Sequence, residues 1–329
     1  MINVIIKDGL GNQMFQYAFA RLLVEKHRQR GEEEHIRIIT QFIATRQDKG
    51  NDKREMSLQH FILDAKTEVM PESEQKQAMR QFRWRTLFSS GIKEIIRWRL
   101  LRRYHSTDAL AERRGRHGIY YPYGPYTEHP VTLTRCQEKY VFGFFQSIRN
   151  VMPIADILRE DFKVKTPPSP ENAALLREIE ACNAVCLHIR RGDYLNPRWK
   201  NLQICDFDYY SRAIDAILAR TERPVFYVFS NTHDDLEWIA RNYHFAQTYP
   251  GDGNPIELRY VDLGNPDYEE FRLMCSCRHF IISNSTFSWW PAFLSGLSPE
   301  KVVCAPHRWN LEYDDDYKIY DPSWIRIPR

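Results

Sequence analysis

Short runs of β-branched and aromatic residues recur along the chain and alternate with stretches of helical periodicity. Within 14–29, apolar residues at positions 15, 18, 19, 22 and 23 form the stripe of an amphipathic helix. Because strands that alternate with helices are typical of parallel sheets covered on both faces, the pattern predicts an α/β protein. The predicted strands are 3–6, 36–39, 140–145, 184–189, 225–229, 280–282 and 302–304, and further helices are predicted at 207–219, 234–241 and 267–277.

A proline-rich segment divides this pattern into two parts. Residues 166–170 read Thr-Pro-Pro-Ser-Pro, and three prolines so close together do not fit inside a helix or a central strand. The 329 residues also suit about two domains of ordinary size. We therefore expect one α/β domain at 1–166 and a second at 171–329, with an irregular tail after about residue 300.

Composition excludes several classes of protein. Hydrophobic residues make up 43% and charged residues 27%, which is ordinary for a globular chain. A net charge of +3 is too small for a protein that coats nucleic acid through a broadly basic surface, so no nucleic-acid partner is expected. The first apolar run is short and is interrupted by Lys7, which fits a strand better than a signal peptide. Seven scattered cysteines without a Cys-x-x-Cys pair predict free thiols and a cytoplasmic chain.

One segment, 76–116, is strongly basic. It holds twelve Lys or Arg against three acidic residues, a net charge of +9, and Trp84, Leu87, Phe88, Ile92, Ile95 and Ile96 fall on one helical face. Such a helix either packs on a domain core with a solvated basic face or lies on an anionic membrane surface. A non-catalytic protein that binds membranes or nucleic acid through this segment is the interpretation furthest from an enzyme.

Two motifs follow predicted strands and suit a diphosphate. His188-Ile189-Arg190-Arg191-Gly192-Asp193-Tyr194 comes after the strand at 184–189, where parallel sheets bind ligands. Arginine grips phosphate through two hydrogen bonds, although a structural ion-pair cluster would have the same composition. After the strand at 280–282, Ser283 to Ser288 offer hydroxyls and backbone N–H groups at a helix start, either as an anion site or as ordinary caps. Pro291 is expected in the first helical turn.

Dinucleotide and metal signals are weaker. Gly9-Leu10-Gly11-Asn12-Gln13 follows the first strand, but Met14 breaks the Gly-x-Gly-x-x-Gly pattern and disfavours NAD. Its glycines still permit close approach to a ligand, and Asn12 and Gln13 are suited to sugar hydroxyls. Asp206 and Asp208 form an Asp-x-Asp pair that either holds a divalent ion or opens a helix. The histidines and cysteines lack zinc spacing, so we expect no metal.

Taken together, the motifs resemble those of a known family. GLGNQMFQYAFA at 9–20, HIRRGDY at 188–194 and EEFRLMCSCRHFIISNSTFSWWPAFLS at 269–295 are similar to the α-1,2-fucosyltransferases of glycosyltransferase family 11, and GFFQS at 143–147 resembles its usual Gly-Tyr-Trp-Gln-Ser. The resemblance implies a GT-B fold, two Rossmann-like α/β domains facing a central cleft. It also implies metal-independent, inverting transfer of L-fucose from GDP-β-L-fucose to the 2-hydroxyl of a terminal galactoside.

The same resemblance assigns candidate residues. Arg190 would bind the β-phosphate as the catalytic cation, and His188 would lie near the guanosine. Glu270 matches an expected guanine reader, and Gln146 joins Asn12 and Gln13 on the acceptor side. The remaining candidate donor-site residues are Ser230, Asn284, Ser285, Thr286 and Phe287.

Some points stay open in the sequence. The base is either Asp193 or Asp8, which stands where the family usually has Gly, and Ser230-Asn231-Thr232 replaces a usual Ser-Asp-Asp. The expected acceptor is a galactose-terminated oligosaccharide or a lipid-linked glycan, which would place the cytoplasmic enzyme at the inner membrane surface. The alternative enzyme is another nucleotide-sugar glycosyltransferase, metal-dependent through Asp206 and Asp208.

Overall fold

The computed structural model describes residues 1–44, 55–91, 108–121, 129–203, 205–296, 298–311 and 318–328. The chain forms two compact units, Met1–Lys163 and Val164–Arg329, so the division falls just before the proline-rich segment. Both units are α/β with parallel sheets, which confirms the predicted fold class. Of the basic segment, 92–107 lies outside the described residues.

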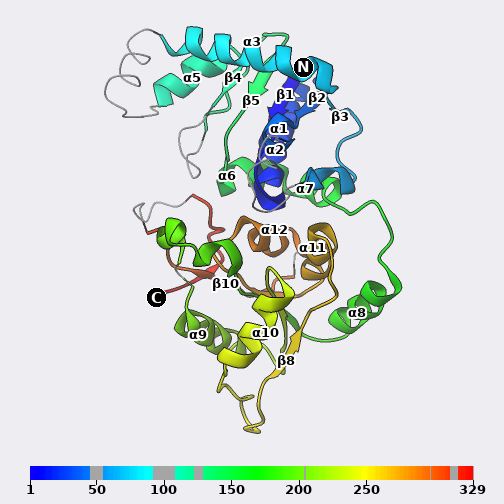
Figure 1. Cartoon of the computed structure of the whole chain (residues 1–329), viewed down its shortest axis with the longest axis vertical. Coiled ribbons are helices and arrows are strands. Elements are labelled where there is room, and N and C mark those ends of the chain that lie inside the picture. The colour runs from blue at the N-terminus through cyan, green and yellow to red at the C-terminus, as the bar shows by residue number, and fades with distance from the viewer. Residues whose placement is uncertain are drawn as a thin grey trace. The chain divides into compact units, whose positions relative to one another are not determined.

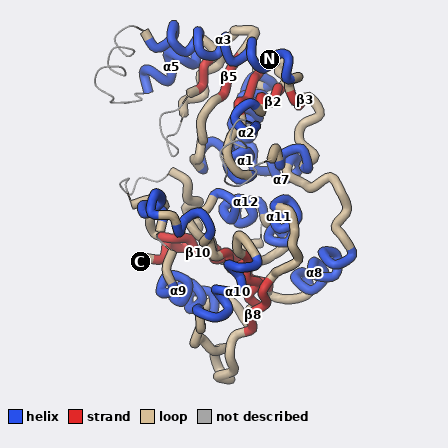
Figure 2. Tube along the Cα trace, viewed as in Figure 1, coloured by secondary structure: helices blue, strands red, loops and turns tan. Residues whose placement is uncertain are grey.

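The sheet of the first unit has the strand order β3-β2-β1-β5-β4 (Figure 1), and Figure 2 draws its strands in red. All its neighbours are parallel, and the buried Val4 of the central strand pairs with Ile38 on one side and Val141 on the other. The two strands missed by the sequence pattern, β3 and β4, are short and lie at the edges. The strands are β1 (Ile2–Ile5), β2 (Ile36–Ile39), β3 (Thr67–Val69), β4 (Ile119–Tyr120) and β5 (Lys139–Val141).

Helices cover both faces of this sheet. Successive side chains of a strand point to opposite faces. Accordingly, Ile119 packs in a cluster with Met79 and Phe82 of α3 (Glu72–Ser90). Its neighbour Tyr120 contacts Phe19 of α1 (Leu10–Arg28). The remaining elements of the unit are α2 (Gln41–Ala44), η2 (Ser57–His60), α5 (Asp108–Arg116), α6 (Ile148–Val151), η3 (Met152–Ile154) and α7 (Ala155–Asp161).

The second unit has a six-stranded parallel sheet in the order β11-β10-β9-β6-β7-β8. Its central strands β6 and β7 are fully buried and, apart from His188 at the end of β6, apolar, as expected for strands covered on both faces. Strand β10 matches the strand predicted at 302–304, but the expectation of an irregular tail after it is wrong, because β11 pairs with β10 and extends the sheet. The strands are β6 (Ala184–His188), β7 (Val225–Phe229), β8 (Glu257–Tyr260), β9 (His279–Ile281), β10 (Val303–Pro306) and β11 (Ile325–Ile327).

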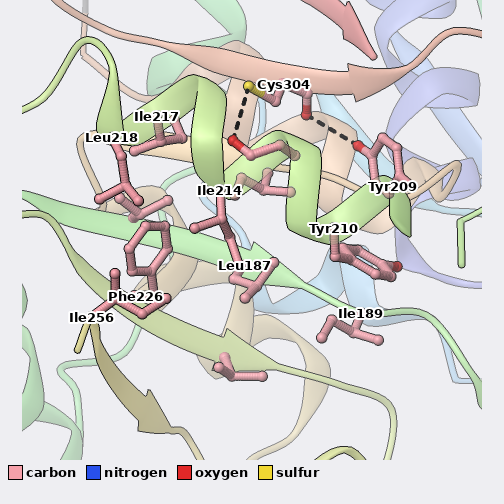
Figure 3. Close-up of a cluster of buried hydrophobic side chains, with 14 of the residues drawn as sticks. Leu187, Ile189, Tyr209, Tyr210, Ile214, Ile217, Leu218, Phe226, Ile256 and Cys304 are labelled. Carbon is pink, nitrogen blue, oxygen red and sulfur yellow. Dashed lines mark hydrogen bonds between the residues drawn. The ribbon is translucent and has the colours of Figure 1, made fainter. Parts of the chain in front are cut away.

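Helix α9 (Phe207–Leu218) supplies much of the core of this unit. Its buried Tyr210, Ile214 and Ile217 pack with Leu187 of β6 and Phe226 of β7 (Figure 3). The other helices are α8 (Pro170–Glu180), η4 (Gly192–Leu195), η5 (Pro197–Leu202), α10 (His233–Asn242), α11 (Asp267–Cys275) and α12 (Thr286–Leu294). All seven cysteines are free thiols. Among the described helices, none has the length and apolar character needed to cross a bilayer.

Candidate active site

Three loops meet at one edge of the second sheet, where β9, β6 and β7 end side by side. Leu187 of β6 pairs with Ile281 of β9, and His188 pairs with Phe229 of β7. The chain passes from β6 to β7 on one side and later returns to β9 on the other side. Such a reversal of strand order opens a crevice at the carboxyl ends of the strands, which is where α/β sheets bind ligands.

His188 is the last residue of β6 and is buried at this edge of the sheet. Its Nδ1 lies 2.8 Å from the Ser283 hydroxyl oxygen, and only 2% of the residue is exposed. Burial, with a smaller contribution from Arg190, lowers the pKa of His188 to about 3. Its ring centroid lies 6.0 Å from that of Phe287. His188 is therefore a neutral imidazole at pH 7, suited to hydrogen bonding but not to neutralising phosphate charge.

Arg190 follows two residues later and lies near the Tyr194 ring. Its guanidinium carbon lies 5.2 Å from the centroid of the Tyr194 ring. The Tyr194 hydroxyl donates to the backbone oxygen of Asn284, at 3.0 Å. Tyr194 therefore links the arginine to the loop that opens α12.

Arg191 points to a different element. Its Nε lies 3.3 Å from the Asp235 carboxylate on α10, and its guanidinium lies over the Trp238 ring. Its backbone N–H donates to the Asn231 side-chain oxygen, at 3.1 Å. Asn231 also lies against Gly192, whose φ of +47° suits glycine, and a Cβ there would approach Asn231 to 3.1 Å. The loop is thus fixed from the β7 side.

Helix α12 begins at this edge with an N-terminal cap. The Ser285 hydroxyl oxygen accepts from the backbone N–H of Phe287, at 3.3 Å. Thr286 and Phe287, in the first turn, are half-buried. The positive end of a helix favours anions, although the Phe287 N–H is already bonded to the cap. The expectation for Pro291 is wrong: because the cap at Ser285 starts the helix at Thr286, Pro291 lies beyond the first turn.

Glu270 lies on α11, in the connection between β8 and β9. Burial, together with Asp267 and Asp262, raises the pKa of Glu270 to about 8. No described residue forms a hydrogen bond with its carboxyl group. A carboxyl group kept neutral by its surroundings suits a ligand that offers hydrogen-bond donors and thereby stabilises the charged form.

Two other candidates of this unit have structural partners. The Asn284 amide donates to the backbone oxygens of Leu202 and Trp309, each at 3.0 Å, so it ties loops together. The Ser230 hydroxyl donates to the Ile189 oxygen at 2.8 Å and joins the ends of β7 and β6. Asp193 lies in η4, and its side chain is outside the described part of the structure.

The Asp-x-Asp pair opens a helix. The Asp206 carboxylate accepts from the backbone N–H of Tyr209 at 3.0 Å and caps α9, and Asp208 lies exposed in the first turn. Acidic residues at this end complement the helix dipole. In the described ranges, no three His, Cys, Asp or Glu side chains gather as metal ligands would.

The acceptor-side candidates lie at the carboxyl edge of the first sheet. The Gln146 amide donates to the Asn12 side-chain oxygen, at 2.6 Å, which joins the loop after β5 to the first turn of α1. Gln13 is fully buried and donates to the backbone oxygens of Asp8 and Glu55, so it holds the loop before α1. Asp8 itself has a φ of +66°, a conformation that favours glycine.

Sequence reasoning did not single out several residues of these edges. Tyr194 belongs to the motif at 188–194, and its place in that motif was the sequence signal that could have identified it. Trp238 and Asp235 carry no sequence signal, because they meet Arg191 only through the fold. In the first unit, the Lys7 ammonium lies 3.8 Å from the centroid of the Phe144 ring.

Comparison with known proteins identifies the family. The model of the family described as Glycosyl transferase family 11 matches residues 1–328. The chain belongs to glycosyltransferase family 11. It is therefore a glycosyltransferase, and the resemblance read from its motifs is confirmed.

The relatives of this family 11 chain carry related names. It is 26% identical to the O-antigen biosynthesis glycosyltransferase WbnK of Escherichia coli, over 98% of this chain and 99% of that protein. It is 32% identical to an alpha-1,2-colitosyltransferase of Escherichia coli over 57% of this chain and 62% of the relative. Identity to human galactoside alpha-(1,2)-fucosyltransferase 1 is 36%, over 44% of this chain and 36% of the relative.

Among solved structures, the chain is similar to the crystal structure of fucosyltransferase NodZ from Bradyrhizobium. The TM-score is 0.49, with 13% sequence identity over 89% of this chain and 92% of that chain.

Proposed function

We propose that this family 11 enzyme transfers L-fucose from GDP-β-L-fucose to the 2-hydroxyl of a terminal galactoside, with inversion and without a metal. The names of the α-1,2-fucosyl and α-1,2-colitosyl relatives support the linkage and the deoxy-sugar donor. The site residues support the chemistry, as the following steps argue.

The observation that carries the proposal is the meeting of a cationic loop and a helix N-terminus on neighbouring strands. Arg190 follows β6, α12 follows β9, and Tyr194 joins the two. When the bond from fucose to the β-phosphate breaks, negative charge grows on the diphosphate. A guanidinium and the first N–H groups of α12 can stabilise that charge with little reorganisation. This arrangement supplies positive potential without a metal ion.

The base of the donor is proposed to be guanine. The Glu270 carboxylate, once ionised, can accept from both the ring N–H and the exocyclic amine on one edge of guanine, whereas uracil offers a single donor there. His188, neutral at pH 7, would lie near the guanosine. Ser285, Thr286 and Phe287 complete the diphosphate contacts from the start of α12.

The acceptor is proposed to bind at the carboxyl edge of the first sheet, with Asn12 and Gln146 bonded to sugar hydroxyls. Either Asp193 or Asp8 would take the proton from the acceptor hydroxyl. The acceptor is a galactose-terminated oligosaccharide or a lipid-linked glycan, and a lipid-linked acceptor would bring the cytoplasmic enzyme to the inner membrane surface.

The test is incubation of the enzyme with GDP-fucose and a panel of β-galactosides, followed by linkage analysis of the product. We expect an α-1,2-linked fucosyl product, formed equally well in excess EDTA. Absence of transfer from GDP-fucose to every galactoside would contradict the donor or the acceptor. Loss of activity in EDTA would favour the metal-dependent alternative through Asp206 and Asp208.

The colitosyltransferase relative supports a second candidate donor, GDP-colitose. Colitose differs from fucose by lacking the 3-hydroxyl, so the two donors share the GDP contacts and the transferred bond. Competition between GDP-fucose and GDP-colitose for one acceptor separates them. If kcat/KM is higher for GDP-colitose than for GDP-fucose, the donor is GDP-colitose. The assignments of the other site residues would then stay the same.

A further inference from the structure

Helix α3 has two faces of opposite character. One face buries Ala78, Met79 and Phe82 against the first sheet. On the other side, 71% of Trp84, 76% of Phe88 and 42% of Leu87 are exposed. Phe88 contacts the His117 ring, with 5.6 Å between centroids. The aromatic residues that the sequence placed on one helical face nevertheless lie outside the face that packs on the sheet.

The exposed aromatic residues lie among uncompensated positive charge. Lys76, Arg80 and Arg83 are exposed on the same helix, and residues 75–90 contain no Asp or Glu. No carboxylate in the described part of the chain pairs with these three side chains. By contrast, the neighbouring Arg85 donates to the backbone oxygen of Glu138 and serves the fold.

Helical geometry places these groups together. Residues three, four, seven or eight positions apart share one side of a helix, which brings Lys76, Arg80, Trp84 and Phe88 into one row. Leu87 and Arg83 flank the row. An open hollow of about 720 Å³ runs along it, and Lys76, Arg80 and Trp84 are among the residues that line it. Cationic groups and an indole thus line one side of an open surface hollow large enough to admit a phosphate group.

We propose that this outer face of α3, made of Lys76, Arg80, Arg83, Trp84, Leu87 and Phe88, docks the enzyme on an anionic lipid bilayer. Trp, Phe and Leu enter the boundary between headgroups and acyl chains, while Lys and Arg attract the anionic headgroups. In the hollow, the cations meet a lipid phosphate. All six residues of this face lie on α3, and docking through them does not depend on the donor or the linkage.

Charge and apolar character together favour this occupant over two others. A second copy of the chain, in a symmetric contact, would bring two basic faces together and cause repulsion. A nucleic acid would satisfy the cations, but it would leave Leu87 and Phe88 largely in contact with water or phosphate. A bilayer interface accepts both kinds of side chain.

The test is co-sedimentation of the full chain with vesicles of phosphatidylcholine alone and of phosphatidylcholine mixed with phosphatidylglycerol. Two double variants separate the contributions, Trp84→Ala with Phe88→Ala and Arg80→Glu with Arg83→Glu. A matched control, Arg177→Glu with Arg220→Glu, makes the same charge change at exposed sites of the second unit that form no ion pair among the described residues. Because all the altered α3 side chains are exposed, melting temperatures should stay unchanged.

We expect wild type and control to bind the anionic vesicles and not the neutral ones. Each α3 double variant should lower the bound fraction at least about tenfold, and added salt should weaken binding. Vesicles with brominated acyl chains should quench tryptophan fluorescence less in Trp84→Phe than in wild type. All variants should keep wild-type transfer to a water-soluble acceptor, so a failure of the proposed function would not affect the vesicle result.

Several results would overturn the proposal. These are equal binding to both kinds of vesicle, no binding to either, or a loss in the control as large as in the α3 variants. Binding to RNA that depends on Arg80 and Arg83, with vesicle binding insensitive to Trp84 and Phe88, would make the face a polyanion site. Concentration-dependent dimers abolished by the α3 variants would make it an interface between copies.

Discussion

The guanidinium of Arg191 lies over the Trp238 ring, with its carbon 3.3 Å from the ring centroid. This cation–π contact and the ion pair with the Asp235 carboxylate hold the Arg191 side chain against α10. Its neighbour Arg190 instead leans toward Tyr194, which is bonded to the loop before α12. Two adjacent arginines of one motif therefore have different partners, so their roles can be tested separately.

The first prediction concerns Arg190. If it stabilises charge that develops on the leaving diphosphate, its removal should affect kcat more than donor binding. Arg190→Ala should lower kcat by about 10²–10³, the range for losing one preorganised group. Arg190→Lys keeps the charge but loses the planar fork, so it should recover only part of that loss. The measurements are kcat, the Kd for GDP and the melting temperature.

Arg191→Lys provides the matched control. It should lower the melting temperature, because the stacking on Trp238 is lost, while folded enzyme keeps most of its kcat. A destabilised but fully active Arg190→Lys would contradict the catalytic assignment. Both arginines would then have a structural role only, stabilising the loop at the end of β6.

The second prediction concerns Glu270 and guanine. Glu270→Gln removes a hydrogen-bond acceptor from the proposed guanine-binding site. The Kd for GDP should therefore rise, and the fold should stay intact. Unchanged GDP affinity by calorimetry would remove Glu270 from the site. Ser276→Ala, an exchange on the surface turn after α11, is the control expected to bind GDP as wild type does.

A third prediction follows from the raised pKa of Glu270. With a pKa of about 8 in the folded protein and an ordinary value near 4.5 when unfolded, the folded state binds the additional proton between these values. The contribution to stability is therefore fully present below pH 4.5 and is lost as pH rises through about 8. Glu270→Gln should melt above wild type at pH 8.5 and close to it at pH 4.5.

The same group should couple GDP binding to a proton. A carboxylate that accepts from guanine must first ionise, so binding at pH 7 should release a proton. Calorimetry in buffers of different ionisation enthalpy measures this release, and it should disappear in Glu270→Gln. A wild-type enthalpy that is independent of the buffer would contradict the ionised contact.

The fourth prediction uses His188, whose pKa moves the other way. Burial holds the folded pKa at about 3, while an unfolded histidine titrates near its ordinary value of 6.5. Its stabilising contribution is present above pH 6.5 and is lost as pH falls toward 3. His188→Asn removes this titration, so its melting temperature should fall less than that of wild type between pH 6.5 and 4.5. Parallel pH dependence in the two proteins would show that His188 is not buried in its neutral form.

The sequence predicted the elements that carry a strong local pattern. The central strands β1, β2, β6 and β7 are mostly apolar and largely buried, and each was expected within one or two residues. The edge strand β8 was missed because its sequence, Glu-Leu-Arg-Tyr, is largely exposed and gives no apolar run. Strand β11 was missed because its three residues, Ile-Arg-Ile, form too short a run to stand out in the tail.

The site residues also fall into those that the sequence predicted and those that it did not. Residues that follow directly after a predicted strand, such as Arg190 and Ser285, were expected at the sheet edge because parallel strands end together. Partners that arrive from distant helices were not predictable, since Trp238 lies on a separate helix and its contact with Arg191 depends on the packed fold. The start of α1 was placed too late, at residue 14, because polar Asn12 and Gln13 hide the first turn; Gln13 is buried through its bonds to backbone oxygens.

The last prediction separates backbone strain from catalysis at Asp8. This residue adopts a φ of +66°, where a side chain is unfavourable by about 1 kcal/mol relative to glycine. Asp8→Gly should therefore raise the melting temperature, whereas Asp8→Asn, which tolerates this conformation, should leave it nearly unchanged. Turnover then identifies the base, because removing a general base typically lowers kcat by about 10²–10⁴. A loss of this size in both Asp8 variants assigns the base to Asp8. If both turn over normally while Asp193→Asn does not, the proton goes to Asp193, and the carboxylate at position 8 only strains the loop before α1.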